Sequence, residues 1–407
     1  MKKNLILLLL IGVIILTGCS RDIQVKNSDR KNLSSKQENK INKKSLPSKI
    51  AFVKNDTLYI MNEDGTLQEP LVSNVSDKSR PSWSPDGSKI LYTIEEQEDT
   101  YGLYILNVSD KTQKRISDVF IPLEPPPSFR EAVWSPDGTK IVFLKLDKSD
   151  QNVQLHLIDL KDLKDTTLVK AKDLETKLIS LHPTLPHIPN SFAWSPDGKT
   201  IAFSLASFIF TVNNDGSDLK IIKDMKELGY CVQLIWAKNK IIFAVNRNEP
   251  YEKYGVKKGF TPDIIEVTSI FIMNSYGNGI KKLGEYVVFR GFALSPDGEK
   301  IAIAGKNNYD SDQFLYIINL IDETQVSLKN DENYSNYSVN SLSLSPCWSP
   351  DGSKIAFVKN TYQNHTSARV SVVTDMSGIF VVSSNGQNET QILNAEQGFP
   401  YPLTWSP

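Results

Sequence analysis

One pentapeptide constrains the fold of this chain more than any other feature. Trp-Ser-Pro-Asp-Gly, or the same motif with Leu in the first place, begins at Trp83, Trp134, Trp194, Leu294 and Trp348. Two incomplete copies begin at Trp236 and Trp405, so seven positions recur at intervals of 42 to 60 residues. A period of this length is typical of a repeat architecture, in which stacked units bury a continuous core.

The segment between two copies predicts four short strands. Ser-Pro-Asp-Gly is typical of a tight turn, because Pro presets φ, Asp bonds the local backbone and Gly accepts positive φ. A β-rich run such as 140–143 follows this turn, and then another such as 103–106. A second turn such as 213–216 leads to a further run, and the run that contains the next Trp brings the number of strands to four. Four strands joined as a meander, in each unit of this size, are typical of a β-propeller blade.

The two ends of the repeat region predict how the ring closes. Residues 48–55 and 353–360 are the same octapeptide, Ser-Lys-Ile-Ala-Phe-Val-Lys-Asn. The second copy follows a full Trp-Ser-Pro-Asp-Gly, whereas the chain ends on Trp405-Ser406-Pro407. We therefore expect the C-terminal strand to complete the blade that begins at Ser48, which leaves no exposed sheet edge. The sequence predicts an all-β fold, a seven-bladed propeller of four-stranded antiparallel blades over 47–407.

These repeats resemble the TolB-type, WD-like β-propeller family over the whole of 47–407. The resemblance implies the fold, but not one function, because TolB, prolyl oligopeptidase-like enzymes and oligogalacturonate lyases share the repeat. We expect neither the small α/β domain of TolB nor a hydrolase domain here. The chain also lacks the Gly-x-Ser-x-Gly motif of α/β-hydrolases. The sequence therefore favours a non-enzymatic propeller.

The first 18 residues predict a lipoprotein signal peptide. Lys2 and Lys3 precede an apolar run over 5–16, which is short for a spanning helix. Leu16-Thr17-Gly18-Cys19 resembles the lipobox of bacterial lipoproteins. That resemblance implies cleavage before Cys19, lipidation of its thiol, for example with palmitate, and a lipid-anchored protein on the extracytoplasmic side of the cell membrane. An ordinary signal peptide or an uncleaved anchor is the alternative.

Residues 19–46 predict a flexible tether between the lipid and the propeller. From 20 to 46 there are eight basic and three acidic residues and few apolar ones, a composition that does not support a packed core. Such a basic segment would be attracted to an anionic membrane surface; the alternative is a solvated linker. The whole chain has 46 basic and 47 acidic residues, which excludes an evenly basic nucleic-acid binder.

The long connections of the repeat predict where a partner binds. Strands of a meander alternate in direction, so the tight turns share one face and the longest connections share the opposite one. These connections are expected to be loops over 119–131, 170–190, 246–267, 329–345 and 360–375. Long loops on a rigid scaffold commonly carry binding function. The aromatic candidates on these loops are Phe129, Tyr251, Tyr254, Phe260, Tyr309, Tyr334, Tyr337 and Tyr362. We expect a monomeric scaffold that binds an envelope protein, peptide or glycan there. The alternative is that the rings only pack the loops onto the blades.

Three histidines offer an alternative function. His182, His187 and His365 fall on the same face as the long connections, and imidazoles can bind a metal. The resemblance to oligogalacturonate lyases then implies a metal-dependent polysaccharide lyase or hydrolase. Because no two of these residues have a tight ligand spacing, we expect neither a metal nor another cofactor. The turn Asp residues, the Trp residues, His156 and the thiols of Cys231 and Cys347 are expected to be structural.

Overall fold

The computed structural model describes residues 48–76, 78–97, 100–121, 132–149, 152–170, 172–174, 189, 191–205, 207–254, 264–308, 313–329, 337–342, 346–364, 371–373, 378–394 and 401–407. The chain divides into two compact units, Met1–Leu46 and Pro47–Pro407, and every described residue belongs to the second. Among these residues, no helix has the length and apolar character needed to cross a membrane.

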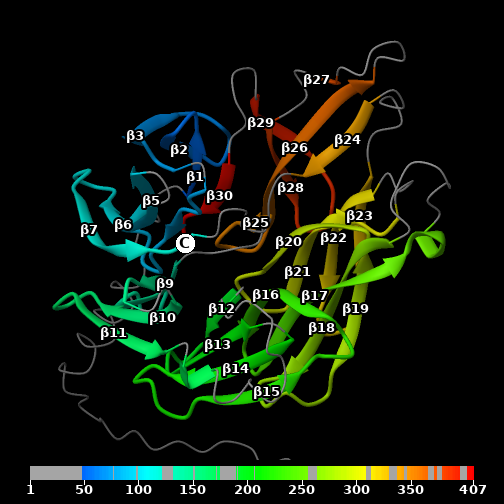
Figure 1. Ribbon diagram of the computed structural model, residues 1–407. Helices are drawn as coiled ribbons and strands as arrows, with labels where there is room; N and C mark the ends of the chain where they lie inside the picture. Colours follow the sequence, from blue (N-terminus) through cyan, green and yellow to red (C-terminus); the bar gives the residue numbers. More distant parts are fainter. Residues whose placement is uncertain are drawn as a thin grey trace, which may run out of the picture. The chain divides into compact units, whose positions relative to one another are not determined.

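Seven antiparallel sheets make up the second unit, and we number them as blades in chain order (Figure 1). Blade 1 contains β1 (Lys49–Lys54), β2 (Thr57–Asn62), β3 (Glu69–Ser73) and β30 (Tyr401–Trp405). Blade 2 contains β4 (Ser82–Trp83), β5 (Lys89–Gln97), β6 (Thr100–Asn107) and β7 (Gln113–Val119). Blade 3 contains β8 (Ala132–Trp134), β9 (Lys140–Asp147), β10 (Asn152–Asp159) and β11 (Lys164–Val169). Blade 4 contains β12 (Ser191–Trp194), β13 (Thr200–Leu205), β14 (Phe208–Asn213) and β15 (Lys220–Asp224).

Blades 5 and 7 contain the 11-residue strands. Blade 5 contains β16 (Tyr230–Ala237), β17 (Lys240–Pro250), the 3-10 helix η1 (Tyr251–Tyr254), β18 (Ile264–Asn274) and β19 (Lys281–Tyr286). Blade 6 contains β20 (Val288–Leu294), β21 (Lys300–Lys306), β22 (Gln313–Asn319) and β23 (Gln325–Lys329). Blade 7 contains β24 (Tyr337–Leu342), β25 (Cys347–Trp348), β26 (Lys354–Asn364), β27 (Ser371–Val373), β28 (Gly378–Ser383) and β29 (Thr390–Asn394). Its sheet has six strands, because β24, β25, β27 and β28 all pair with β26.

The predicted ring closure is confirmed. The C-terminal strand β30 pairs with β1, with Trp405 opposite Ile50 and Thr404 opposite Ala51 (Figure 1). The Lys49 N–H donates to Ser406 Oγ at 2.7 Å, as the Lys354 N–H donates to Ser349 Oγ at 2.9 Å in blade 7. The two chain ends therefore rebuild, without a covalent link, the turn that the other blades form within one segment.

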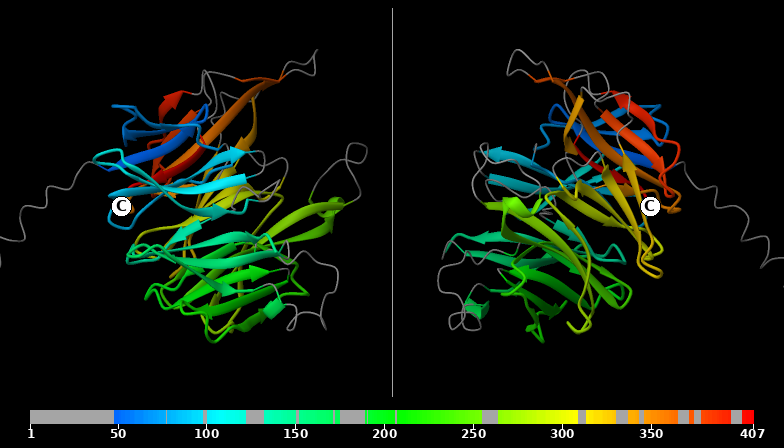
Figure 2. Two further views of the ribbon diagram at one scale, coloured as in Figure 1. Left: turned by 60° about the vertical axis from the view of Figure 1, so that its left-hand side comes forward. Right: turned by 90° about the vertical axis from the view of Figure 1, so that its right-hand side faces the viewer.

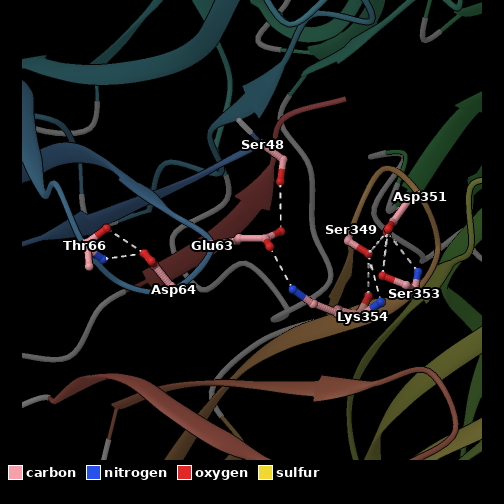
Figure 3. Close-up of polar contacts among 8 residues, drawn as sticks. All are labelled: Ser48, Glu63, Asp64, Thr66, Ser349, Asp351, Ser353 and Lys354. Carbon is pink, nitrogen blue, oxygen red and sulfur yellow. Dashed lines mark hydrogen bonds and ion pairs between the residues drawn. The ribbon is translucent and has the colours of Figure 1, made fainter. Parts of the chain in front are cut away.

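The Ser-Pro-Asp-Gly turns are held by their own side chains. In blade 7, Ser349 Oγ donates to Asp351 Oδ1 at 2.6 Å, and the Ser353 N–H donates to the same oxygen at 3.0 Å (Figure 3). These bonds, the one from Ser349 above all, hold the pKa of Asp351 at about 2. The Ser–Asp bond recurs in all five complete turns. The expectation that these carboxylates are structural is confirmed.

The tryptophans join neighbouring blades. An indole N–H donates to a backbone carbonyl of the preceding blade's innermost strand in four joints: Trp83 to Thr404, Trp134 to Ser82, Trp194 to Val133 and Trp348 to Ala293, at 3.0–3.3 Å. In blade 6, Leu294 has no such donor. There Gln233 of blade 5 bonds both the N–H and the carbonyl of Phe292, at 3.0 and 2.9 Å. An amide side chain thus replaces the missing indole.

The expectation that residues 246–267 form a long loop is wrong in part. Strands β17 and β18 are 11 residues each and pair from Lys240–Asn274 out to Pro250–Ile264. The extra length is stable because one side of the extension is apolar, with Ile265 and Val267 packed on Val287. Strand β26 likewise extends to Asn364. Both long hairpins project to the same side of the ring, away from the C-terminus (Figure 2).

Candidate functional site

The structure describes only some of the aromatic residues predicted to bind a partner. Phe129, Phe260, Tyr309 and Tyr334 lie outside the described residues. Tyr251 begins η1, and Tyr337 and Tyr362 lie in the neighbouring strands β24 and β26, where Ser338 pairs with Tyr362. Of the eight, Tyr254 is the one whose side chain is described. The backbone therefore places two pairs of candidates on the two long hairpins, in blades 5 and 7.

Tyr254 belongs to a cluster of polar residues around Glu285. The Tyr254 hydroxyl donates to Glu285 Oε1 at 2.7 Å, and Ser269 Oγ donates to Glu285 Oε2 at 3.0 Å. Arg247 bonds the same carboxylate at 2.8 Å, and Lys282 also contacts it. Burial alone would raise the pKa of Glu285, but the bonds from Lys282 and Tyr254 outweigh it and hold the pKa at about 2. Glu285 is thus a permanent anion that ties η1 to β18 and β19.

We call β17, η1 and β18 the blade 5 arm. Tyr254 packs at its base on the small apolar cluster of Ile265, Val267 and Val287, and the Lys253 ammonium lies 5.1 Å from its ring centre. The arm therefore has both an apolar and an ionic attachment to its blade. This packing of Tyr254 fits the alternative in which the aromatic rings hold the loops onto the blades, although Tyr254 is still partly exposed.

Two exposed apolar side chains on the blade 5 arm and its blade escaped the sequence analysis. Ile264 is 54 % exposed at the start of β18, and Tyr230 is 41 % exposed at the start of β16. The Tyr230 hydroxyl bonds Glu266, whose other oxygen accepts from Asn246 Nδ2 at 2.6 Å. Partial burial and then the bond to Glu266 raise the pKa of Tyr230 to about 12. No local pattern predicts the exposure of Ile264, because it depends on the extension of β17 and β18 as paired strands.

A central cavity of about 490 Å³ lies between the innermost strands of blades 1 to 6. In these six blades, the residue before the Trp position contributes to the wall: Thr404, Ser82, Val133, Ala193, Ile235 and Ala293. The described residues that line it include no acid, base or histidine. The described lining combines apolar side chains with the Gln233 amide and with hydroxyls such as that of Ser191.

The described residues give no support to a metal site. His182, His187 and His365 lie outside them, and among the described residues no three His, Cys, Asp or Glu side chains are grouped to hold a metal. His156 Nδ1 lies 2.7 Å from Asp165 Oδ1, and its ring packs on Phe143. Cys231 is buried and Cys347 is partly buried, and burial raises the pKa of Cys231 to about 12. The structural roles expected for His156 and the thiols fit these contacts.

Comparison with known proteins supports the fold. No known family profile matches the chain. A segment covering 38 % of it is 26 % identical to the Bacillus subtilis protein described as uncharacterized peptidase YuxL, and covers 26 % of that protein. Similar solved structures include an oligogalacturonate lyase in complex with manganese, at 15 % identity and TM-score 0.52 over 74 % of this chain and 79 % of the other.

TolB-type propellers are also among the similar structures. TolB from Acinetobacter baumannii is 19 % identical, with a TM-score of 0.48 over 88 % of this chain and 67 % of the other. At these identities the likeness concerns the fold. The chain is a seven-bladed β-propeller with TolB-type and oligogalacturonate lyase neighbours.

Proposed function

We propose that this chain is a lipid-anchored envelope lipoprotein that acts as a non-enzymatic scaffold. In this proposal Cys19 carries the lipid, residues 19–46 are the tether, and the propeller binds a protein, peptide or glycan through its long-connection face. The protein is held at the extracytoplasmic side of the cell membrane.

The blade 5 arm is the observation that supports binding through this face. It extends a paired hairpin beyond the blade, it is braced by the Glu285 cluster, and it exposes Ile264. A rigid element that exposes an apolar side chain loses little conformational entropy when it binds, which favours affinity. Exposed apolar side chains surrounded by polar groups are also typical of interaction surfaces.

The alternative to the non-enzymatic part of the proposal is a metal-dependent lyase or hydrolase that uses His182, His187 and His365. Metal analysis of the purified protein tests the alternative of a metal-dependent lyase: we expect less than stoichiometric metal, with no change in His365→Ala. One bound metal per chain that is lost in His365→Ala would favour the lyase.

Membrane fractionation of cells that express Cys19→Ser tests the anchor. We expect the wild type in the membrane fraction, and the variant as an unprocessed precursor without the lipid mass. Cross-linked co-purification tests the binding face: Ile264→Glu is expected to lose the partner, whereas the matched Leu67→Glu, which changes an exposed residue on the tight-turn face, is expected to keep it. Loss with Leu67→Glu alone would place the partner on the other face.

A further inference from the structure

The tight-turn face has a groove at one joint of the ring. In most joints, a turn Gly of one blade covers the turn Pro of the preceding blade. A methyl group built on Gly138 would lie 3.3 Å from Pro85, and one on Gly198 would lie 3.8 Å from Pro136. The pairs Gly352–Pro296 and Gly87–Pro407 repeat the contact at 3.7 Å and 3.6–3.7 Å. These contacts fill the ends of four joints.

The joint between blades 4 and 5 lacks this cover. In blade 2, six positions separate Trp83 from Lys89, whereas in blade 5 only four separate Trp236 from Lys240. The shorter turn, Lys238-Asn239, contains no Gly that could cover Pro196. The result is a cavity of about 570 Å³, which we call the blade 4–5 groove; its wall includes Pro196, Thr211, Lys220, Trp236, Lys238 and Tyr276. This size lies within the range of about 300–1,000 Å³ for ligand pockets.

Thr211 carries an unpartnered hydroxyl in the wall of this groove. The side chain is 3 % exposed and its Oγ1 has no hydrogen-bond partner. The strand register gives the equivalent residues of the other six blades as Ile60, Ile105, Leu157, Ile272, Ile317 and Val381. A buried hydroxyl without a partner is unfavourable by about 1–3 kcal/mol. Blade 4 therefore has a hydroxyl-bearing residue where the other blades have an aliphatic one. This difference occurs at the same joint that lacks the Gly–Pro contact.

Trp236 adds a second unusual group. The indole N–H groups of Trp83, Trp134, Trp194 and Trp348 donate to the preceding blade. Among the described contacts, none pairs the Trp236 indole N–H, and the ring is partly exposed in the groove wall. Tyr276, at the rim, is 81 % exposed. The groove thus combines flat rings with unpartnered, uncharged polar groups.

The charged groups of the groove are already paired within the protein. Lys220 bonds Asp218 at 2.6 Å, and Lys238 bonds Glu299 at 3.1 Å. Asp197 accepts from Ser195 Oγ at 2.7 Å and from the Lys199 N–H at 3.1 Å. An ionic ligand would have to compete with these pairs. The groups left open suit a neutral ligand with many hydroxyls and apolar ring faces, because aromatic side chains combine apolar area with a polar edge.

We propose that the blade 4–5 groove binds a neutral oligosaccharide, with Thr211 and Trp236 as hydrogen-bonding residues and Tyr276 and Pro196 as stacking surfaces. The site lies on the face opposite the blade 5 arm. It is therefore independent of the proposed scaffold function.

Calorimetric titration of the purified full-length protein tests this proposal. The probes are maltotriose, chitotriose, trigalacturonic acid and a Ser-Pro-Asp-Gly peptide. We expect binding of at least one neutral trisaccharide at millimolar concentration or below. Thr211→Val removes the hydroxyl but keeps the shape, so binding is expected to weaken about tenfold, which corresponds to the loss of one hydrogen bond, while the melting temperature stays equal or rises.

Two further variants sharpen the test. Replacing residues 237–239 by Ser-Pro-Asp-Gly-Ser rebuilds the standard turn and should abolish binding by filling the groove. Ile105→Val, at the equivalent position of blade 2, is the matched control and should leave binding unchanged. The proposal is overturned if neither neutral trisaccharide binds at about 10 mM, if Thr211→Val leaves affinity unchanged, or if the peptide or trigalacturonic acid binds more tightly than both neutral sugars.

Discussion

The same octapeptide occurs in two regions of this molecule with different outcomes. In both copies the second to seventh residues lie in a strand, and Ile50 and Phe52 are as buried as Ile355 and Phe357. In blade 1 the strand β1 ends at Lys54, and Asn55 and Asp56, at φ 47° and 54°, form a two-residue turn. In blade 7 the strand β26 continues to Asn364.

The residues that follow the octapeptide explain this difference. Asn-Asp at 55–56 suits a hairpin turn with two positive φ values, whereas Thr361 and Tyr362 follow Asn360 and are typical of strands. Lys54 is partly exposed, but Lys359 is 6 % exposed, bonds Glu389 at 2.9 Å and lies within about 5 Å of the ring centres of Phe314 and Phe380. The repeated sequence thus determines the strand that enters the core of each blade. The residues that follow it determine where the strand ends and which side chains are exposed.

The two copies are also linked through Glu63. Glu63 accepts from Ser48 Oγ of the first copy at 3.1 Å and from Lys354 Nζ of the second at 2.8 Å (Figure 3). This contact and the β30–β1 pairing close the ring between blades 7 and 1. In blade 7 the turn is one continuous segment, whereas in blade 1 it is rebuilt from two segments. Substitutions in the two blades can compare their contributions to the free energy of unfolding.

The largest expected effect concerns the Trp residues of the two turns. Trp348→Ala is expected to lower the free energy of unfolding by about 3–5 kcal/mol, because it removes a large buried side chain and the indole bond to Ala293. Trp405→Ala is expected to cost less, since Trp405 Nε1 has no hydrogen-bond partner. Chemical denaturation measures both; an equal or larger loss for Trp405→Ala would mean that the closing strand contributes through more than packing.

The lysines at the end of the octapeptide come next. Lys359→Ala leaves Glu389 unpaired at the joint of blades 6 and 7 and should lower the free energy of unfolding by about 2 kcal/mol. This loss is below the value for a fully buried pair, because Glu389 is partly exposed. Lys54→Ala, its matched control, should change the free energy of unfolding by less than about 0.5 kcal/mol. Equal effects in urea denaturation would show that the burial of Lys359 contributes nothing.

The Glu63 contact should have a small effect. Glu63→Gln removes the ion pair with Lys354, whose side chains are 40 % and 41 % exposed, so the expected loss is about 0.5 kcal/mol or less at low salt. The loss should shrink as salt is added, because salt screens exposed charges. A loss that persists unchanged at 1 M salt would contradict a purely ionic role.

A further expected difference depends on pH. The folded pKa of Asp351 is about 2, below its ordinary value of 3.8, so its stabilising effect is complete above about pH 4 and is lost as the pH falls towards 2. Asp351→Asn should therefore lower the melting temperature at pH 7 and converge with the wild type near pH 2. A constant difference across this range would show that the ionised carboxylate is not what holds the turn.

The sequence predicted the blades better than the surfaces. Trp and Ser-Pro-Asp-Gly report local packing and turn chemistry, so blade number and ring closure followed from their spacing. The extension of β17 and β18 did not, because it depends on the packing of Ile265 and Val267 against Val287 in another strand. The exposure of Ile264 and the unpartnered hydroxyl of Thr211 likewise depend on contacts across strands and joints, which no local pattern records.

Site-specific photo-cross-linking in intact cells tests the central claim most directly. One photoreactive residue replaces Ile264 on the blade 5 arm, and another replaces Leu67, which is 73 % exposed on the tight-turn face. We predict one discrete cross-linked product from position 264 and none from position 67, with the product lost when the arm's brace is removed by Glu285→Ala. Discrete products from position 67 and none from position 264 would contradict the claim that the long-connection face binds the partner.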